Sequence, residues 1–239
     1  MIAINPARSV KAPGREVYAQ KFYTEVQITA LLQALAHESP RFRAMVLLAL
    51  STGIRRGELV ALEWGHIDFQ VHTIRICQAA ELITGNPQRL KATKTHGSLR
   101  TVVVPEITQA ALREWQQLQG NERLQAGTLW QHSAFIFTQP LGHWVRADEV
   151  SKQFRKFLKR HRLPILPFHG LRHTVATLLI AQGLPVRTVA NVLGHTQTST
   201  TLNIYSHVLE SSTRHAAEIM DELLAQSVQG ATMSTIDIL

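Results

Sequence analysis

The spacing of apolar residues changes twice along the chain, and this change constrains the fold more than any other feature. Apolar residues recur at helical spacing over residues 24–53. Segments rich in β-branched residues follow at positions 73–76, 89–93 and 99–104, with turn sequences between them. Helical spacing then returns and continues along the second half of the chain. The sequence therefore predicts a mainly α fold with a small antiparallel β-sheet, an α+β arrangement.

Residues typical of helix ends place the boundaries of these helices. Thr24 and Gln27 fit a capping box at the start of the first helix, and Pro40 suits the first turn of the second helix. Gly53 is expected to end that second helix. Further helices are expected at residues 107–119, 150–158, 168–182 and 185–193, and Gly120, Gly183 and Gly194 are expected to end three of them. The Lys/Arg-rich face of the helix at 150–158 suits either contact with phosphates or exposure to solvent.

The chain is expected to divide into three parts. Residues 1–20 contain proline, glycine and scattered basic residues without a sustained period, which is typical of a linker or flexible arm. Residues 21–210 are expected to form the folded domain. Residues 211–239 contain apolar positions at a spacing of three to four, which predicts an amphipathic helix followed by a polar tail.

Charge and cysteine content narrow the class of protein. Lys and Arg number 25 against 17 Asp and Glu, and the net charge of +8 favours a polyanionic partner, nucleic acid before a membrane. No apolar stretch approaches the length of a bilayer span, and the N-terminus lacks a secretory signal, so we expect a cytoplasmic protein without a membrane partner. The single cysteine, Cys77, excludes an internal disulfide, and we expect it to be buried as a small hydrophobic residue.

His169 and Arg172 lie three residues apart in the segment HGLRHT, so on a helix they project from neighbouring positions. Apolar residues such as Leu171 and Val175 gather on a largely separate side, and the polar pair is therefore expected to point away from the core. A guanidinium beside an imidazole suits an oxyanion such as phosphate, because both groups donate hydrogen bonds to it. A structural histidine next to a surface arginine explains the pair about as well.

A metal site is the rival interpretation of the same segment. His169 and His173 are four residues apart, the spacing of two zinc ligands on one helical turn, and His195 is a conceivable third ligand. The zinc protease pattern requires Glu directly after the first histidine, where this chain has Gly170. The sequence therefore disfavours a metal site, and we expect neither a metal nor another cofactor.

Three segments, taken together, resemble the signature boxes of the tyrosine recombinase (phage integrase) family. They are STGIRRGEL at residues 51–59, HGLRHT at residues 169–174, and LGH through YSH at residues 193–207. The segment TKTHGSLRT at residues 93–101 is similar to the β-hairpin that carries the catalytic lysine in this family. The resemblance extends over residues 24–209 and implies the DNA breaking-rejoining catalytic fold.

The resemblance also implies a complete set of catalytic residues. The matching positions are Arg55 (first arginine), Lys94 (hairpin lysine), His169 and Arg172 (central pair), His195 (second histidine position) and Tyr205 (nucleophile). Arg56 adjoins Arg55, but the Thr-Gly-Ile-Arg frame selects Arg55. Lys91 competes with Lys94, which is preferred because Arg100 follows it at the family's spacing.

The implied reaction is cleavage and rejoining of DNA through a 3′-phosphotyrosyl intermediate at Tyr205, without metal or ATP. Arg55 and Arg172 are expected to hold the negative charge that grows on the phosphate oxygens. A phenol has an ordinary pKa of about 10, so a base must help it ionise, and His169 is the candidate. The family assigns protonation of the leaving 5′-oxygen to Lys94.

Other polar residues of the boxes are expected to support this set. His195 is expected to hydrogen-bond the phosphate, and Glu58 to orient Arg55. His173 and His207 are expected to have structural or supporting roles.

The partners implied by the resemblance are double-stranded DNA at attachment sites and further copies of the chain. A homotetramer is expected in the synaptic complex, with the C-terminal helix around residues 219–224 packed on a neighbouring copy, although packing within one chain is equally compatible. Accessory DNA-bending proteins are also expected. Relatives usually carry N-terminal core-binding and arm-binding domains, so we expect this chain to be a fragment that binds DNA weakly, mainly through phosphates.

Two other functions compete with recombination. A type IB topoisomerase shares the tyrosine chemistry, but the short integrase-like boxes favour a recombinase. A non-catalytic helix-turn-helix DNA binder is the second, because the helices at residues 168–182 and 185–193 imitate that motif. This alternative gives no role to Arg55, Lys94 or Tyr205.

Overall fold

The computed structural model describes residues 22–82, 88–92, 99–131, 133–194 and 220. The predicted linker at residues 1–20 and the predicted C-terminal helix lie outside the described residues, apart from Met220. Four of the residues expected at the site, Lys94, His195, Tyr205 and His207, also lie outside them.

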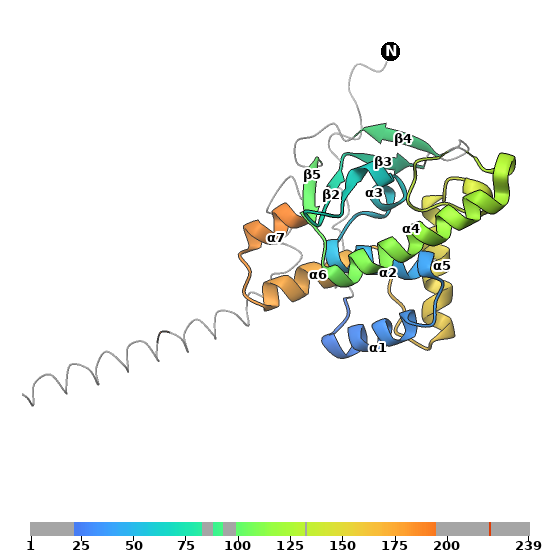
Figure 1. The fold of residues 1–239 in the computed structure, drawn as a ribbon. Coiled ribbons are helices and arrows are strands. Elements are labelled where there is room, and N and C mark those ends of the chain that lie inside the picture. Colours follow the sequence, from blue (N-terminus) through green and yellow to red (C-terminus); the bar gives the residue numbers. More distant parts are fainter. Residues whose placement is uncertain (1–21, 83–87, 93–98, 132, 195–219, 221–239) are drawn as a thin grey trace, which may run out of the picture.

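Within the described residues, α-helices form most of the structure and short strands cover one side of it (Figure 1). The helices are α1 (Glu25–Leu35), α2 (Pro40–Thr52), α3 (Arg56–Val60), α4 (Glu106–Ala126), α5 (Ala147–Arg160), α6 (Gly170–Ala181) and α7 (Val186–Leu193). The strands are β1 (Ile67–Asp68), β2 (Thr73–Ile76), β3 (Gln78–Glu81), β4 (Arg89–Ala92) and β5 (Arg100–Val103). The prediction of a mainly α fold with a small antiparallel sheet is confirmed.

Local sequence signals set the ends of the first two helices as expected. The Thr24 side chain accepts a hydrogen bond from the backbone of Gln27, whose side chain accepts one from the backbone of Thr24 in return. Pro40 occupies the first turn of α2, and Gly53 ends it with φ 61°, a left-handed conformation that costs glycine little.

Several helix boundaries differ from the prediction, and α5 runs over Ala147–Arg160 rather than 150–158. The helix α4 does not end at Gly120 but continues to Ala126, because the residues that follow this glycine are mostly good helix formers that offset its cost of about 1 kcal/mol. The helix α6 begins at Gly170 rather than at residue 168, and His169 is its N-cap residue.

The described strands form two small antiparallel sheets. β1, β2 and β5 make a three-stranded sheet, and β3 pairs with β4. The rung between Ile76 and Arg100 is followed by the rung between Gln78 and Ala92. In sequence, Lys94 falls between these two rungs, in a segment outside the described residues.

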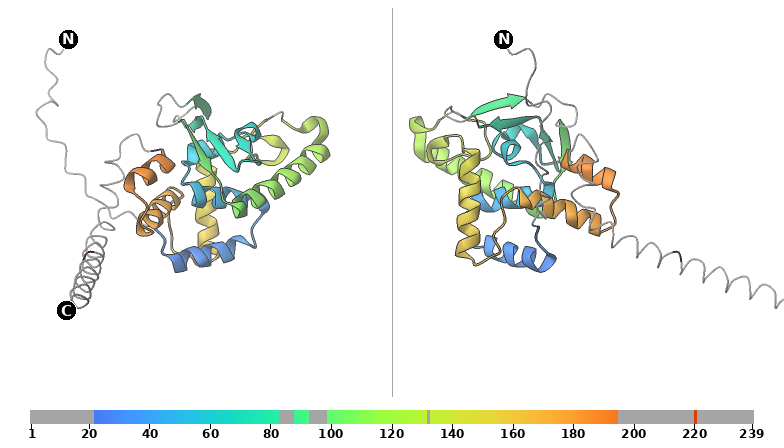
Figure 2. Two further views of the ribbon diagram at one scale, coloured as in Figure 1. Left: turned by 60° about the vertical axis from the view of Figure 1, so that its left-hand side comes forward. Right: turned by 180° about the vertical axis from the view of Figure 1, so that it is seen from behind.

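The core is centred on α2, which packs against α4 and α6 and contacts α5 through aromatic rings. The ring of Phe42 on α2 meets that of Phe157 on α5 at 5.2 Å, edge to face. A smaller apolar cluster, with Val175 and Ile180 of α6 and Leu193 of α7, holds those two helices together. Figure 2 shows α6 and α7 side by side at one end of the molecule, beside β5. No helix among the described residues is long and apolar enough to cross a membrane.

Candidate active site

Three helices meet at the C-terminal end of α2. The carbonyl oxygen of Gly53 accepts a hydrogen bond of 2.7 Å from Nη1 of Arg172 on α6. Leu193 of α7 packs directly on Gly53, since a Cβ atom added there would lie 2.3 Å from Leu193 Cδ2. The segment that leads from Gly53 to Arg55 therefore lies against both α6 and α7.

Arg172 is buried, and the expectation that it points away from the core is wrong. Only 2% of the residue is exposed. The end of α2 accounts for its position, because the last carbonyl groups of a helix lack partners within the helix and carry partial negative charge. The guanidinium of Arg172 donates to this end, and burial with a hydrogen-bond partner holds it in a single place.

Glu58 lies between two arginines. Its carboxylate accepts hydrogen bonds from the backbone N–H of Arg55, at 3.0 Å, and from Nη1 of Arg55, at 2.8 Å. Arg100 on β5 donates to both oxygens of the same carboxylate, through Nη1 at 3.2 Å and Nη2 at 2.9 Å. The side chain of Glu58 is only 3% exposed. The predicted contact between Glu58 and Arg55 is present, and a second cation shares the carboxylate.

Arg55 and Arg56 are adjacent in sequence but point to different parts of the structure. Nη2 of Arg55 donates a 2.9 Å hydrogen bond to the carbonyl oxygen of Gly194, at the end of α7. Arg56 donates instead to the hydroxyl of Ser151 on α5, at 2.7 Å. The side chain of Arg55 is 36% exposed, so it retains surface that a ligand can reach.

His169 and His173 face one another at the start of α6. Their ring centroids are 4.9 Å apart and the rings are nearly perpendicular. His169 keeps an exposed surface, yet partial removal from water, together with the positive charges of Arg172, Arg55 and Arg56, lowers its pKa. Burial, His169 and Arg172 lower the pKa of His173 to about 4. Both imidazoles are therefore neutral at pH 7.

The described residues contain no group of three or more His, Cys, Asp or Glu side chains arranged to hold a metal ion. The lone cysteine, Cys77, is half-buried rather than fully buried, and its Sγ lies 3.3 Å from Nε2 of His66.

Of the two competing lysines, Lys91 is the one that the structure describes. Lys91 lies on β4, where its Nζ is 2.8 Å from a carboxylate oxygen of Glu81 across the β3–β4 pair. Lys94 follows β4 in sequence and lies outside the described residues. The ion pair with Glu81 thus gives the exposed side chain of Lys91 a structural role.

Arg100 belongs to the site, although the sequence predicted no role for it beyond its spacing from Lys94. Its side chain is 8% exposed and packs against Gly194. A signal for this burial was present in the sequence. Arg100 alternates with Val102 and Val104, both buried, and residues two apart on a strand share a face.

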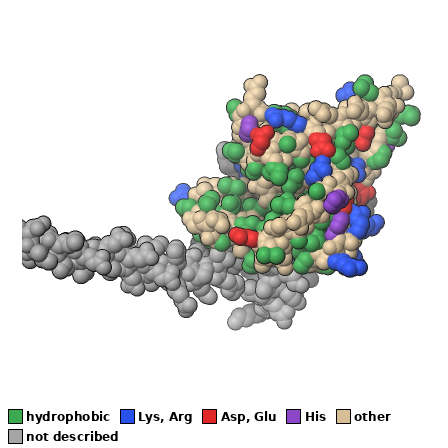
Figure 3. Space-filling view, turned by 60° about the horizontal axis from the view of Figure 1, so that its bottom comes forward, with side chains coloured by type: hydrophobic (Ala, Val, Ile, Leu, Met, Phe, Trp, Pro, Cys, Tyr) green, Lys and Arg blue, Asp and Glu red, His purple; other side chains and the backbone are tan. Residues whose placement is uncertain are grey.

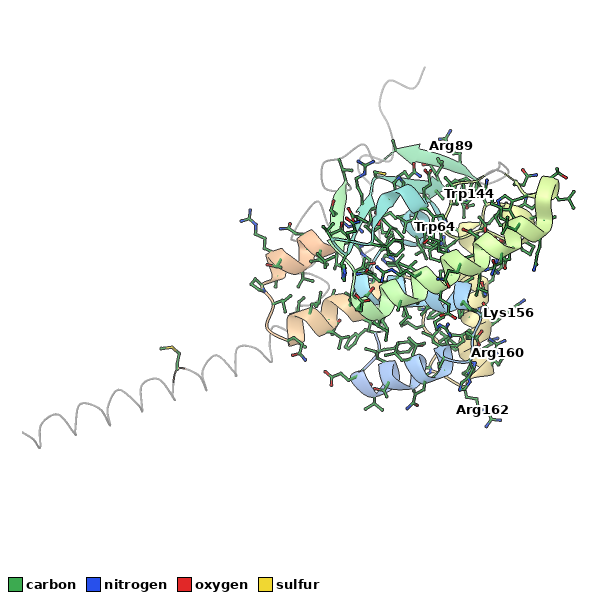
Figure 4. All side chains as sticks on the ribbon, viewed as in Figure 1. Trp64, Arg89, Trp144, Lys156, Arg160 and Arg162 are labelled. Atoms are coloured by element: carbon green, nitrogen blue, oxygen red, sulfur yellow. The ribbon has the colours of Figure 1, made fainter. Side chains whose placement is uncertain are left out.

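The basic residues of α5 lie elsewhere. Lys156, Arg160 and Arg162 project outward along α5 and just beyond it, whereas Arg89 lies on β4 at the other side of the molecule (Figure 4). Seen from below, Lys and Arg side chains gather at one edge, next to histidines (Figure 3). Part of the positive charge of α5 is neutralised within the fold, because Arg160 pairs with Glu38.

Comparison with known sequences decides the family. The model of the phage integrase family matches residues 21–212. The chain belongs to the phage integrase family. Its curated relatives include a tyrosine recombinase XerC-like protein of Caldanaerobacter subterraneus, which is 33% identical, with 93% of this chain and 61% of the relative covered. The ICEBs1 integrase of Bacillus subtilis is 28% identical, with 92% and 59% covered. The chain thus spans about 60% of the length of these relatives.

Solved structures show that the integrase fold is shared. The Tn1549 transposon integrase in complex with a circular intermediate DNA superposes with a TM-score of 0.71 at 20% identity, with 86% of this chain and 67% of that chain covered. The XerA recombinase gives a TM-score of 0.65 at 24% identity, with 83% and 66% covered. The predicted tyrosine recombinase catalytic fold is therefore confirmed.

Proposed function

We propose that this chain is the catalytic domain of a site-specific recombinase, which cleaves and rejoins double-stranded DNA at attachment sites through a 3′-phosphotyrosyl bond to Tyr205. One observation carries the proposal. In a member of the phage integrase family, Arg55 and Arg172 are brought together with His169 around the end of α2, where the fold fixes both guanidinium groups.

The two arginines suit a phosphate in the act of substitution. In the cleavage step, the phenolic oxygen of Tyr205 forms a bond to phosphorus while the bond to the 5′-oxygen breaks. Negative charge grows on the two non-bridging oxygens, and guanidinium donors held in advance stabilise it. Each such donor typically contributes about 10²- to 10³-fold to the rate. Fixing Arg55 through Glu58 and Gly194 is the kind of preorganisation that this effect requires.

His169 suits the role of the base that accepts the Tyr205 proton. Because its pKa is lowered, the ring is unprotonated at pH 7 and has a lone pair available. The positive charges that lower this pKa also favour a phenolate nearby, so the same surroundings assist both partners of the transfer.

The assignment to Tyr205 gains support from the state of Tyr23. The chain has three tyrosines. Tyr23 is 2% exposed, its hydroxyl donates to the carbonyl oxygen of Pro164 at 2.6 Å, and burial raises its pKa to about 12. A phenol in this state is a poor nucleophile, which leaves Tyr205 and Tyr18 as candidates.

The remaining assignments rest on the resemblance of the boxes. We propose that Lys94 donates the proton to the leaving 5′-oxygen and that His195 hydrogen-bonds the phosphate. Two features of the fold are compatible with these roles. In sequence, Lys94 lies between Ala92 at the end of β4 and Arg100 at the start of β5, and the carbonyl that Arg55 binds belongs to Gly194, directly before His195.

The proposed partners follow from the same function. The net charge of +8 suits a DNA backbone, and the solved Tn1549 integrase is itself in complex with DNA. We propose a homotetramer as the synaptic assembly, with residues 211–239 packed on a neighbouring copy, and accessory DNA-bending proteins as further partners. A protein with this activity works in the cytoplasm, where its DNA lies, and we propose that location.

A covalent trapping assay tests the proposal without knowledge of the attachment site. The chain is incubated with a pool of synthetic duplexes that have randomised flanks and a nick, so that cleavage next to the nick releases a short fragment and prevents rejoining. We expect a denaturant-resistant adduct, and mass spectrometry of its peptides is expected to place the DNA on Tyr205.

The matched variants are Tyr205→Phe and Tyr18→Phe. The first is expected to form no adduct, and the second to form as much as the wild-type chain. An adduct that persists in Tyr205→Phe would sink the assignment of the nucleophile. Absence of any adduct from the wild-type chain, at low salt and with excess DNA, would count against cleavage activity in this domain.

A further inference from the structure

Arg100 stands out among the described residues as a buried cation outside the expected catalytic set. It is 8% exposed, and both terminal nitrogens of its guanidinium donate to the two oxygens of Glu58. This fork-to-fork arrangement fixes the direction of the carboxylate as well as its position. Glu58 in turn binds the backbone and the side chain of Arg55.

Arg100 also changes the net charge of the group of side chains around Arg55. A carboxylate that orients a phosphate-binding arginine also cancels its charge. Here Glu58 has two cationic partners, Arg55 and Arg100, so the cluster has a net charge of +1. Arg55 is therefore oriented by an anion while the cluster as a whole still attracts a phosphate.

The place of Arg100 in the chain ties the cluster to two segments. It forms the first rung of β5 after residues 93–99, the segment that contains Lys94. It also packs against Gly194, where a Cβ atom would lie 2.7–2.9 Å from guanidinium and side-chain atoms of Arg100. Gly194 has φ 69° and lies directly before His195, so only glycine suits both the turn and the contact.

We propose that Arg100 is a positioning residue for DNA strand cleavage. It holds the carboxylate of Glu58 so that Arg55 faces the phosphate, and it anchors the start of β5 and the Gly194 turn to that carboxylate. This inference rests on the proposed function, because it concerns the same reaction.

The ionisation of Glu58 supplies a readout that is specific to this role. Burial acts to raise the pKa of Glu58, but hydrogen bonds and positive charge from Arg100, and then from Arg55, outweigh burial and hold the pKa below its usual value. His169 also senses the charge of Glu58. Glu81 lies on β3, which packs against α3, and its carboxylate is already paired with Arg89 and Lys91. Removal of Arg100 therefore leaves burial less opposed, and the pKa of Glu58 rises.

The experiment compares Arg100→Gln, Arg100→Lys, Glu58→Gln and the double variant in the trapping assay, with Arg43→Gln as the matched control. Arg43 also forms an ion pair with a glutamate, Glu114, but lies ten residues before Gly53 on α2, about 15 Å along the helix. Cleavage rates at saturating DNA, DNA affinity and thermal unfolding are measured for each protein across pH 5 to 8, a range set by ordinary carboxyl and imidazole pKa values of about 4 to 6.5.

We expect Arg100→Gln to lower the cleavage rate about 10- to 100-fold while DNA affinity changes less than about threefold. The acid limb of its pH profile is expected to move to higher pH. Arg100→Lys, which keeps the charge but loses the fork, is expected to recover part of the rate. In the Glu58→Gln background, Arg100→Gln is expected to add little, because its effect passes through that carboxylate. Arg43→Gln is expected to cleave like the wild-type chain.

Three results would overturn the inference. Arg100→Gln that cleaves at the wild-type rate with an unshifted pH profile shows that the residue does not position the site. If the losses in cleavage rate of Arg100→Gln and Glu58→Gln multiply in the double variant, Arg100 does not act through Glu58. If Arg100→Gln fails to fold, Arg100→Lys takes its place. A folded Arg100→Lys with the cleavage rate and pH profile of the wild-type chain would overturn the inference. An active wild-type chain in each of these cases leaves the proposed function standing, whereas a chain that forms no adduct removes both.

Discussion

Glu58 and Arg100 lie 42 positions apart in sequence and face each other as a buried ion pair, with Nη1–Oε1 and Nη2–Oε2 distances of 3.2 and 2.9 Å. Glu58 lies on α3 and Arg100 on β5, so the pair joins these two elements. Glu58 also binds Arg55 at the start of α3. The interface of the helix and the strand thus doubles as the support of a proposed catalytic arginine.

Glu58→Gln is expected to destabilise the fold strongly, because it removes the anion between two arginines and leaves the largely buried Arg100 without its counter-charge. The expected loss in the free energy of unfolding is on the order of 3 kcal/mol. Urea denaturation of the purified chain measures it. The control is Glu114→Gln, which breaks an ion pair with Arg43 at a side chain that is 47% exposed, and its expected cost is below about 1 kcal/mol. Equal losses for the two variants would contradict the importance given to burial.

Alanine is expected to have opposite effects at two glycines. Gly53→Ala places a Cβ atom 2.3 Å from Leu193 Cδ2 at a backbone φ of 61°, so we expect a loss of about 1–3 kcal/mol. Gly120→Ala lies within α4 and meets open space, so we expect a gain of about 0.5–1 kcal/mol. Urea unfolding midpoints distinguish the signs. A Gly53→Ala chain as stable as wild type would refute the close packing of α7 on the end of α2.

Acid is expected to destabilise the chain partly through His173. Its pKa is about 4 in the folded protein, lowered by burial and then by His169 and Arg172, against an ordinary value of 6.5. Between these values the unfolded chain binds more protons, so stability is complete above pH 6.5 and falls as the pH drops towards 4. In His173→Gln, the slope of unfolding free energy against pH in this window is expected to decrease by at most about 1.4 kcal/mol per unit. An unchanged slope would show that His173 titrates normally in the fold.

The two lysines are expected to separate in a cleavage assay. Lys94→Ala removes the proposed general acid, and we expect the cleavage rate to fall about 10²- to 10⁴-fold. Lys91→Ala removes an exposed ion pair with Glu81, and we expect less than about a threefold change. Measurement uses the trapped adduct as a function of time. The reverse order would transfer the role to Lys91.

Much of the fold follows from signals that act over a few residues. The capping box at Thr24, the proline at the start of α2, and the left-handed glycines at Gly53 and Gly194 each depend on neighbours within one or two turns. Such signals are legible in a sequence because the partners are adjacent. Where a local signal is weak, as at Gly120, the residues around it decide, and the predicted helix end was wrong.

The sequence by itself determined the order of helices and strands and, through its boxes, the family and the candidate residues Arg55, His169 and Arg172. Only the tertiary structure decided that Arg172 is buried on the end of α2 and that Arg100 shares Glu58 with Arg55. The physical reason is distance along the chain. Partners 42 or 119 residues apart are chosen by strand register and helix packing, and no local pattern encodes those choices.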